Sequence, residues 1–136
     1  METTSDARQT VREGIVSVVY PERHSARVTF PDKDDVVSAE LPILTPCGSQ
    51  NKSYSLPDVG ESVICLFSSN DDLSGTGFIL GARYDDKNPP AVNSQDITRM
   101  DFKDGTFIQF DRAKSELRIE CKGDIIITGK RIFLNE

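Results

Sequence analysis

The chain contains few side chains of the kinds that carry out acid–base chemistry, and their spacing does not assemble a site. Its one histidine, His24, stands in the run PERHS, which has the composition of a turn. General-base catalysis or metal binding by an imidazole would need partner residues, and no partner can be named from this stretch. We therefore expect His24 to lie in a solvent-exposed turn without a catalytic role.

Two acidic runs, PDKDD at residues 31–35 and NDDLSG at residues 70–75, offer carboxylates in clusters. Neither run has the ligand spacing or the terminal Glu of an EF-hand loop. We expect solvated turns at both, with adventitious calcium binding as the alternative. The nearby glycines Gly75, Gly77 and Gly81 are not followed by a helix that could cradle a phosphate. We therefore expect them to be present because the local backbone conformation needs glycine.

The three cysteines, Cys47, Cys65 and Cys121, are odd in number, far apart and outside any CxxC pattern. A disulfide framework or a zinc site is therefore not expected, and we predict free thiols that pack or stay inert. The sequence also lacks a Gly-x-Ser-x-Gly motif, a Cys/His pair and a plausible carboxylate dyad. We predict that the protein is not an enzyme and needs no cofactor or metal.

The overall charge argues against polyanionic partners. Lys and Arg total 16 against 22 Asp and Glu, a formal net charge of −6, so we expect no nucleic-acid binding. The aromatic residues are not interleaved with basic ones as in a single-strand-binding platform, since Tyr54 has only Lys52 nearby. No run reaches the ~20 apolar residues of a membrane span, and METTSDARQT has no signal-peptide core, so we expect synthesis in a cytoplasm.

The first half of the chain has the pattern of a small all-β domain. Residues 1–10 are polar and are expected to form a flexible or helical arm, and residues 11–84 alternate β-branched runs with turn residues. Five strands joined in this way predict a closed OB-fold barrel, although an SH3-like barrel fits the same pattern. The predicted strands are Val11–Tyr20, Ser25–Phe30, Val36–Leu44, Ser62–Phe67 and Gly77–Tyr84.

The second half is a ladder of short strands. Residues 85–95, DDKNPPAVNSQ, form a stiff Pro-rich connector, and residues 96–136 follow it with much shorter loops. The predicted strands are ITRMDF, TFIQFD, ELRIEC, DIIIT and RIFLN. In ELRIEC, alternation points Leu117, Ile119 and Cys121 to one side and the charged residues to the other.

This segment has too little chain to cover its own apolar residues, and the run GDIIITGK shows the difficulty most clearly. A strand with three consecutive isoleucines is typical of burial on both faces. Since no second layer is available within one molecule, we expect other copies of the chain to provide the cover, most simply as a trimer. The predicted trimer core consists of Ile108, Phe110, Leu117, Ile119, Cys121, Ile125 and Ile127.

Three stretches, in this order, carry a resemblance to a known family: LPDVGESVICLF (56–67), GFILGARYDDKNPP (77–90) and DGTFIQFDRAKSELRI (104–119). With them, residues 11–134 resemble the phage baseplate assembly protein V family and the related VgrG spikes. The resemblance implies an N-terminal OB-fold followed by a short intertwined trimeric β-helix. It further implies a homotrimeric virion structural protein in the baseplate of a phage, tailocin or related secretion particle.

In such particles the spike pierces the target cell envelope, which it contacts transiently, while its barrels dock to the tail hub and tube proteins. This chain departs from longer members because its β-helix is short and its end lacks the His-x-His motif with which some tips bind iron. We expect either a separate PAAR-like protein or the continuation of a trimmed chain to cover the tip. The alternative function is an OB-fold module that binds oligosaccharide or single-stranded nucleic acid, and retention on heparin or single-stranded DNA would favour it.

Overall fold

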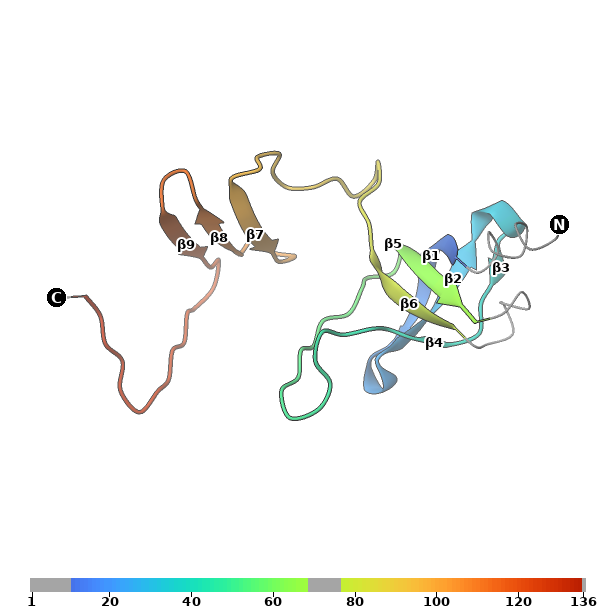
Figure 1. Cartoon of the computed structure of the whole chain (residues 1–136), viewed down its shortest axis with the longest axis horizontal. Coiled ribbons are helices and arrows are strands. Elements are labelled where there is room, and N and C mark those ends of the chain that lie inside the picture. The colour runs from blue at the N-terminus through green and yellow to red at the C-terminus, as the bar shows by residue number, and fades with distance from the viewer. Residues whose placement is uncertain (1–10, 69–76, 136) are drawn as a thin grey trace. The chain divides into compact units, whose positions relative to one another are not determined.

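The computed structural model describes residues 11–68 and 77–135, which form two compact units of antiparallel β-structure. The first unit ends at Pro89 and the second begins at Pro90 (Figure 1). The expected N-terminal arm, residues 1–10, lies outside the described residues. The all-β class predicted from the sequence is confirmed within the described ranges, where the only helices are two single-turn 3-10 segments, η1 (Pro21–Arg23) and η2 (Pro31–Lys33).

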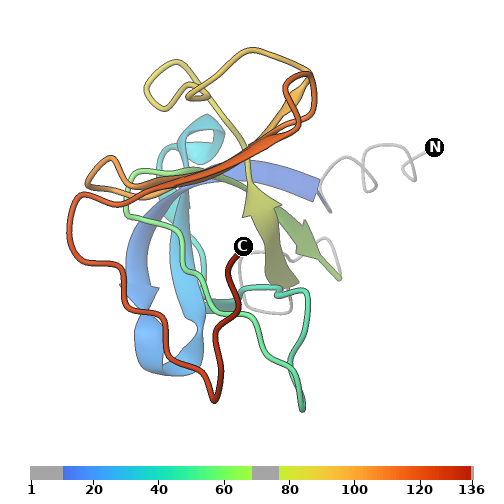
Figure 2. The same ribbon diagram turned by 90° about the vertical axis from the view of Figure 1, so that its left-hand side faces the viewer.

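The first unit is one antiparallel sheet in the order β3-β2-β1-β5-β6, with β4 also paired to β2. Figure 2 shows the long strand β1 bending as it crosses the sheet, and its register with β2 shifts between Val16 and Val18, as a β-bulge would cause. The core includes Phe30, Leu41, Phe67 and Ile79, all almost fully buried. The strands are β1 (Val11–Tyr20), β2 (Ser25–Phe30), β3 (Val36–Val37), β4 (Leu41–Pro42), β5 (Ser62–Phe67) and β6 (Gly77–Ala82).

Gly14 allows the close approach of the paired strands β1 and β2. A Cβ atom at residue 14 would lie 2.3 Å from Cγ1 of Val28 and 2.8 Å from the carbonyl oxygen of Thr29. Both distances are far inside van der Waals contact, so any larger residue would push the strands apart.

The predicted bounds of β1, β2 and β5 are confirmed, but the single strand predicted for residues 36–44 is wrong. This stretch forms two short strands, β3 and β4, because the side chain of Ser38 between them takes part in hydrogen bonds with backbone groups. The Ser38 hydroxyl accepts a hydrogen bond from the Val28 N–H (3.1 Å) and donates one to the carbonyl of Ala39 (2.6 Å). The Val28 N–H thus bonds to a side-chain hydroxyl where a regular strand pair would offer it a backbone carbonyl. Side-chain bonds of this kind compete with strand pairing.

The closed barrel predicted for this unit does not form by strand pairing among the described residues. The chain after β4 nevertheless reaches the outer strand β6. Ile43 forms an isolated parallel bridge with Ile79, and the Leu44 N–H donates to the Ile79 carbonyl at 3.1 Å. Since β3 and β4 have only two residues each, these contacts link the two sides of the sheet without a continuous ladder.

The second unit is an antiparallel meander of β7 (Ile97–Asp101), β8 (Phe107–Asp111) and β9 (Glu116–Glu120). A carboxylate stabilises each of its turns. Asp104 accepts a hydrogen bond from the Thr106 N–H (2.9 Å), and Asp111 accepts one from the Ala113 N–H (2.9 Å). These three strands confirm three of the five predicted for this region.

The two strands predicted at residues 124–128 and 131–135 are wrong for the single chain. The chain from residue 121 to residue 135 has no strand assignment (Figure 1), and no ladder within the described ranges includes it. The physical reason is that a strand exists only with a hydrogen-bonded neighbour. The described part of the chain does not supply one.

Candidate assembly interface

The register of the second unit sorts its side chains onto two faces of different character. In the β8–β9 ladder Ile108 lies opposite Ile119 and Phe110 lies opposite Leu117. In the β7–β8 ladder Met100 lies opposite Ile108. Residues opposite one another project to the same side of a sheet. We call the surface formed by Met100, Ile108, Phe110, Leu117 and Ile119 the apolar face.

The apolar face is not covered by any described residue of the second unit. The exposed fraction is 65% for Leu117 and 60% for Met100, and the other three residues of the face are also exposed. A soluble protein rarely exposes so many adjacent large apolar side chains, and a three-stranded sheet needs a packed face to be stable. The apolar face is therefore a candidate surface for packing against a partner.

The opposite face satisfies its polar groups within the sheet. The Arg99 guanidinium lies 3.7 Å from the ring centroid of Phe107 and donates from Nη1 to Oε1 of Gln109 (2.7 Å) and from Nε to Oδ1 of Asp101 (2.9 Å). Stacking on a ring together with donation from two nitrogens to different acceptors suits Arg particularly well. The polar groups of Arg99, Asp101 and Gln109 on this face therefore have hydrogen-bond partners within the sheet.

The chain after β9 presents a second unpartnered apolar feature, which we call the terminal segment (residues 122–135). Ile126 is 85% exposed and Phe133 is 82% exposed. Among the described residues, the backbone of this segment forms two hydrogen bonds: the Lys122 N–H donates to the Thr106 hydroxyl (3.1 Å), and the Asp124 carbonyl accepts from the Cys121 thiol (3.5 Å). The second unit therefore leaves most of this segment's backbone groups and its isoleucines uncovered.

The structure brings together four of the seven residues predicted for a trimer core: Ile108, Phe110, Leu117 and Ile119. Cys121 lies just beyond β9, half-buried, with its thiol 3.5 Å from the carbonyl of Asp124. Ile125 and Ile127 lie in the terminal segment rather than on the apolar face. Sequence reasoning missed Met100, although the alternation of Thr98, Met100 and Phe102 in ITRMDF would have identified it.

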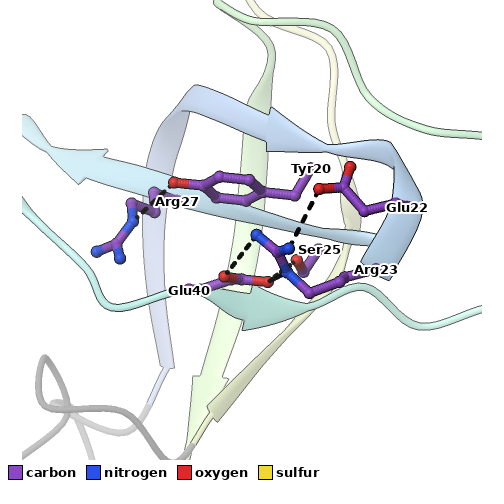
Figure 3. A network of polar contacts seen from close by, with 6 residues as sticks. All are labelled: Tyr20, Glu22, Arg23, Ser25, Arg27 and Glu40. Atoms are coloured by element: carbon purple, nitrogen blue, oxygen red, sulfur yellow. Dashed lines mark hydrogen bonds and ion pairs between the residues drawn. The ribbon is translucent and has the colours of Figure 1, made fainter.

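A polar network in the first unit was also not foreseen (Figure 3). Arg23 donates to both carboxylate oxygens of Glu40, from Nε at 2.7 Å and from Nη2 at 3.3 Å, and the Ser25 hydroxyl donates to the same carboxylate. The bonds from Arg23 and then Ser25 hold the pKa of Glu40 below its ordinary value, and the Glu40 bond raises the pKa of Arg23. The network comprises Tyr20, Glu22, Arg23, Ser25, Arg27 and Glu40.

This network fastens the turn between β1 and β2 to the chain just before β4. The Arg23 guanidinium also lies 4.8 Å from the ring centroid of Tyr20, and the Tyr20 hydroxyl accepts from Nε of Arg27 at 3.0 Å. Every charged group drawn in Figure 3 has a partner within the network. The arrangement is therefore typical of a network that stabilises the fold rather than of a site for acid–base chemistry.

His24 lies in a turn, as predicted, but the expectation that its side chain is exposed to solvent is wrong. His24 has a φ of 53° and is half-buried. Its Nδ1 lies 3.2 Å from the carbonyl of Ile43, and its ring centroid lies 5.6 Å from that of Tyr54. The left-handed backbone turns the ring back onto the loop after β4, which a reading of turn composition alone does not reveal. The side chain therefore helps to hold that loop.

The acidic runs and the cysteines that the sequence offered as candidate site residues do not form a shared site among the described residues. The run at residues 31–35 forms η2 and a turn, and residues 70–75 lie outside the described ranges. Burial raises the pKa of the Cys65 thiol to about 12, as expected for a packing residue, whereas Cys47 is exposed. Among the described residues no cluster of three His, Cys, Asp or Glu could hold a metal ion, and none of the helices there could span a membrane.

Comparison with known proteins adds no assignment: no family model matches the chain, and no curated protein matches it.

Proposed function

We propose that this chain is the structural spike protein of a contractile tail, of the baseplate assembly protein V type, and that it works as a homotrimer. The observation that carries the proposal is the uncovered apolar face of β7–β9, followed directly by a terminal segment that has no strand partner among the described residues. The resemblance of residues 11–134 to that family, described above, supplies the biological setting.

An assembly of three copies would cover the apolar face and would also give the terminal segment strand partners. If each sheet forms one wall of a three-sided prism, Ile108, Phe110, Leu117 and Ile119 of every copy meet near the axis. Burial of each such side chain is worth roughly 1.5–3 kcal/mol. Two stacked sheets would cover the apolar faces but would leave strand edges open, whereas a closed prism leaves none. This favours three copies over two.

The terminal segment fits the same assembly. In an intertwined β-helix each chain finds its hydrogen-bonded neighbours in the other two chains, which would give partners to Ile125, Ile126 and Ile127. The single chain would then show an extended backbone without a ladder, as residues 122–135 do. The core predicted from the sequence, including Cys121, would be completed only on assembly.

The first unit would be an OB-type domain that docks the trimer to the tail hub and tube proteins. Its sheet order and the Ile43–Ile79 bridge are compatible with a barrel whose closure is short. The work of the protein would be mechanical: in a virion or contractile-particle baseplate it would carry sheath force into the target envelope. The exposed Phe133 and Leu134 would be covered either by a separate PAAR-like protein or by further residues of a longer chain.

Location in the particle tests this proposal directly. The chain would carry an epitope tag in cells that make contractile particles, and the purified particles would be labelled with gold-conjugated antibody and viewed by electron microscopy. We expect label at the distal end of the tail. Absence of the chain from the particles, or label distributed along the sheath, would overturn the proposal.

A further inference from the structure

The first unit has an apolar surface of its own, on the side of β1, β5 and β6 that faces away from its core. In the β1–β5 ladder Val11 lies opposite Leu66, and in the β5–β6 ladder Leu66 lies opposite Phe78. Residues opposite one another project to the same side of a sheet. Because the neighbouring residues Cys65 and Ile79 project into the core, the three apolar side chains form one row on the outside.

The next row along the same strands continues this surface. Glu13 lies opposite Ile64, and Ile64 lies opposite Gly81. Gly81 adds no side chain, and a Cβ atom at residue 81 would meet nothing within 4 Å. The surface is therefore open beside Ile64. We call the surface formed by Val11, Glu13, Ile64, Leu66 and Phe78 the outer face of the first unit.

The outer face is accessible and carries no unbalanced charge. The exposed fraction is 51% for Val11 and 38% for Phe78. The one charged residue among the five, Glu13, forms an ion pair with Arg83, whose Nε donates to the Glu13 carboxylate. Adjacent apolar side chains exposed in this way mark a surface for a partner. Since the charge is already paired, that partner does not need a compensating charge.

The distribution of charge restricts where two first units can meet. Residues 1–89 contain 14 acidic and 8 basic residues, whereas residues 90–136 contain 8 of each, so the whole net charge of −6 belongs to the first unit. Copies of this unit therefore repel one another in most orientations. At the outer face they can approach with apolar side chains and a neutralised ion pair between them.

The connector is short enough to keep such copies close together. The Asp85 carboxylate accepts from the Asn88 N–H at 2.8 Å, and the Ser94 hydroxyl accepts from the Asp96 N–H at 3.2 Å. The residues between these two turns, 89–93, can span at most about 18 Å. If the second units form a trimer, the three first units are tethered at a local concentration of about millimolar or higher. A contact too weak for free molecules would then form.

We propose that the outer faces of the first units pack against one another around the trimer axis, so that the assembly has a second interface besides the one formed by β7–β9. This inference rests on the proposed function, because the second units bring the copies together. The occupant of the outer face is thus a second copy of this chain. A tail hub protein seated on the same face is the competing occupant.

Thiol labelling of the purified full chain tests this contact. Val11→Cys places a probe of similar size on the outer face. Val59→Cys is the matched control, because Val59 is exposed in the turn whose Gly60 N–H donates to Val16, farther along β1. A charged maleimide is added, and peptide mass spectrometry follows each cysteine separately, with the exposed native Cys47 as the internal reference. No hub protein is present, so any cover comes from the chain itself.

The labelling rates in three backgrounds isolate the contact. In the trimer the thiol at residue 11 should react at least about tenfold more slowly than the thiol at residue 59. Ile119→Asp, which should release single chains, should make the two rates equal. Phe78→Glu should also speed labelling at residue 11, because it places three carboxylates at the contact, but the mass should stay that of a trimer. Tyr54→Glu, at an exposed ring in the loop after β4, is the matched control and should change nothing.

The outcomes separate this inference from the proposed function. Equal rates at residues 11 and 59 in a sample with the mass of three chains would overturn the contact and leave the spike proposal standing; the hub protein would then be the occupant to test. Slow labelling that persists in single chains of Ile119→Asp would show that the chain covers its own outer face, which also overturns the contact. A parent mass of one chain would overturn both proposals.

The comparison of Phe78→Glu with Tyr54→Glu decides the matter if Ile119→Asp fails to fold. Equally slow labelling at residue 11 in these two variants would refute the contact. Faster labelling in Phe78→Glu alone would support it.

Discussion

Ile108 and Ile119 lie directly opposite each other in the β8–β9 ladder, on a face that the described part of the second unit leaves open. Their exposed fractions are 42% and 55%. A cross-strand isoleucine pair ordinarily sits in a core, where each side chain gains from burial. The pair therefore marks the place where we expect copies of the chain to meet.

Substitution of this pair should break the assembly. Ile119→Asp would place an unpaired carboxylate from each of three copies near the axis, at a cost of several kcal/mol. We expect loss of the trimer at micromolar concentration in sedimentation velocity. The control is Gln109→Asp on the opposite face, where Arg99 can pair with the new charge. An Ile119→Asp protein that sediments and melts like the parent would show that the face is assigned wrongly.

Cys121 offers a covalent test of the same geometry. If it lies in the trimer core, its three copies come close enough for one disulfide, which requires Cα atoms within about 7 Å. Oxidation by copper phenanthroline should therefore give one covalent dimer and one free chain per trimer on a non-reducing gel. Cys121→Ser should abolish the dimer band and Cys47→Ser should not. A dimer band that persists in Cys121→Ser would place the close thiols elsewhere.

The Arg23–Glu40 pair in the first unit predicts a pH-dependent contribution to stability. The folded pKa of Glu40 is lowered, chiefly by the Arg23 hydrogen bond. The contribution is thus present above the unfolded pKa of about 4.3 and is lost as the pH falls through the folded value.

Melting temperatures of the parent and of Glu40→Gln, measured from pH 7 down to pH 3, test this linkage. Glu40→Gln should melt below the parent at pH 7, and the two curves should converge in acid. Glu22→Gln removes the neighbouring carboxylate as a control and should stay closer to the parent, since Glu22 makes a single bond to Arg23 (3.1 Å). A difference for Glu40→Gln that is the same at pH 3 and pH 7 would contradict the linkage.

Much of the fold follows from local sequence pattern. Turn residues bracket β1, β2 and β5 closely enough to give their ends, and the alternation in ELRIEC assigns the facing of Leu117 and Ile119. The strand ends and the facing of the side chains depend only on residues close to one another in the sequence. They could therefore be predicted without knowledge of the tertiary structure.

Other features depend on contacts between residues distant in sequence and could not be predicted. The break after β3 arises because the Ser38 hydroxyl bonds to Val28, and the place of His24 arises because a left-handed residue turns its ring toward Ile43 and Tyr54. The composition of the run at residues 125–127 predicts a strand. A strand also needs a neighbour, and the described single chain does not supply one.

The central claim is that three copies complete the structure of the second unit, and the mass of the intact protein in solution tests it most directly. Multi-angle light scattering on the eluting peak, at micromolar concentration and neutral pH, should give about three times the chain mass of 15.1 kDa. The value should not change on dilution over a tenfold range, because apolar residues from all copies share one core. A mass equal to that of one chain would contradict the account.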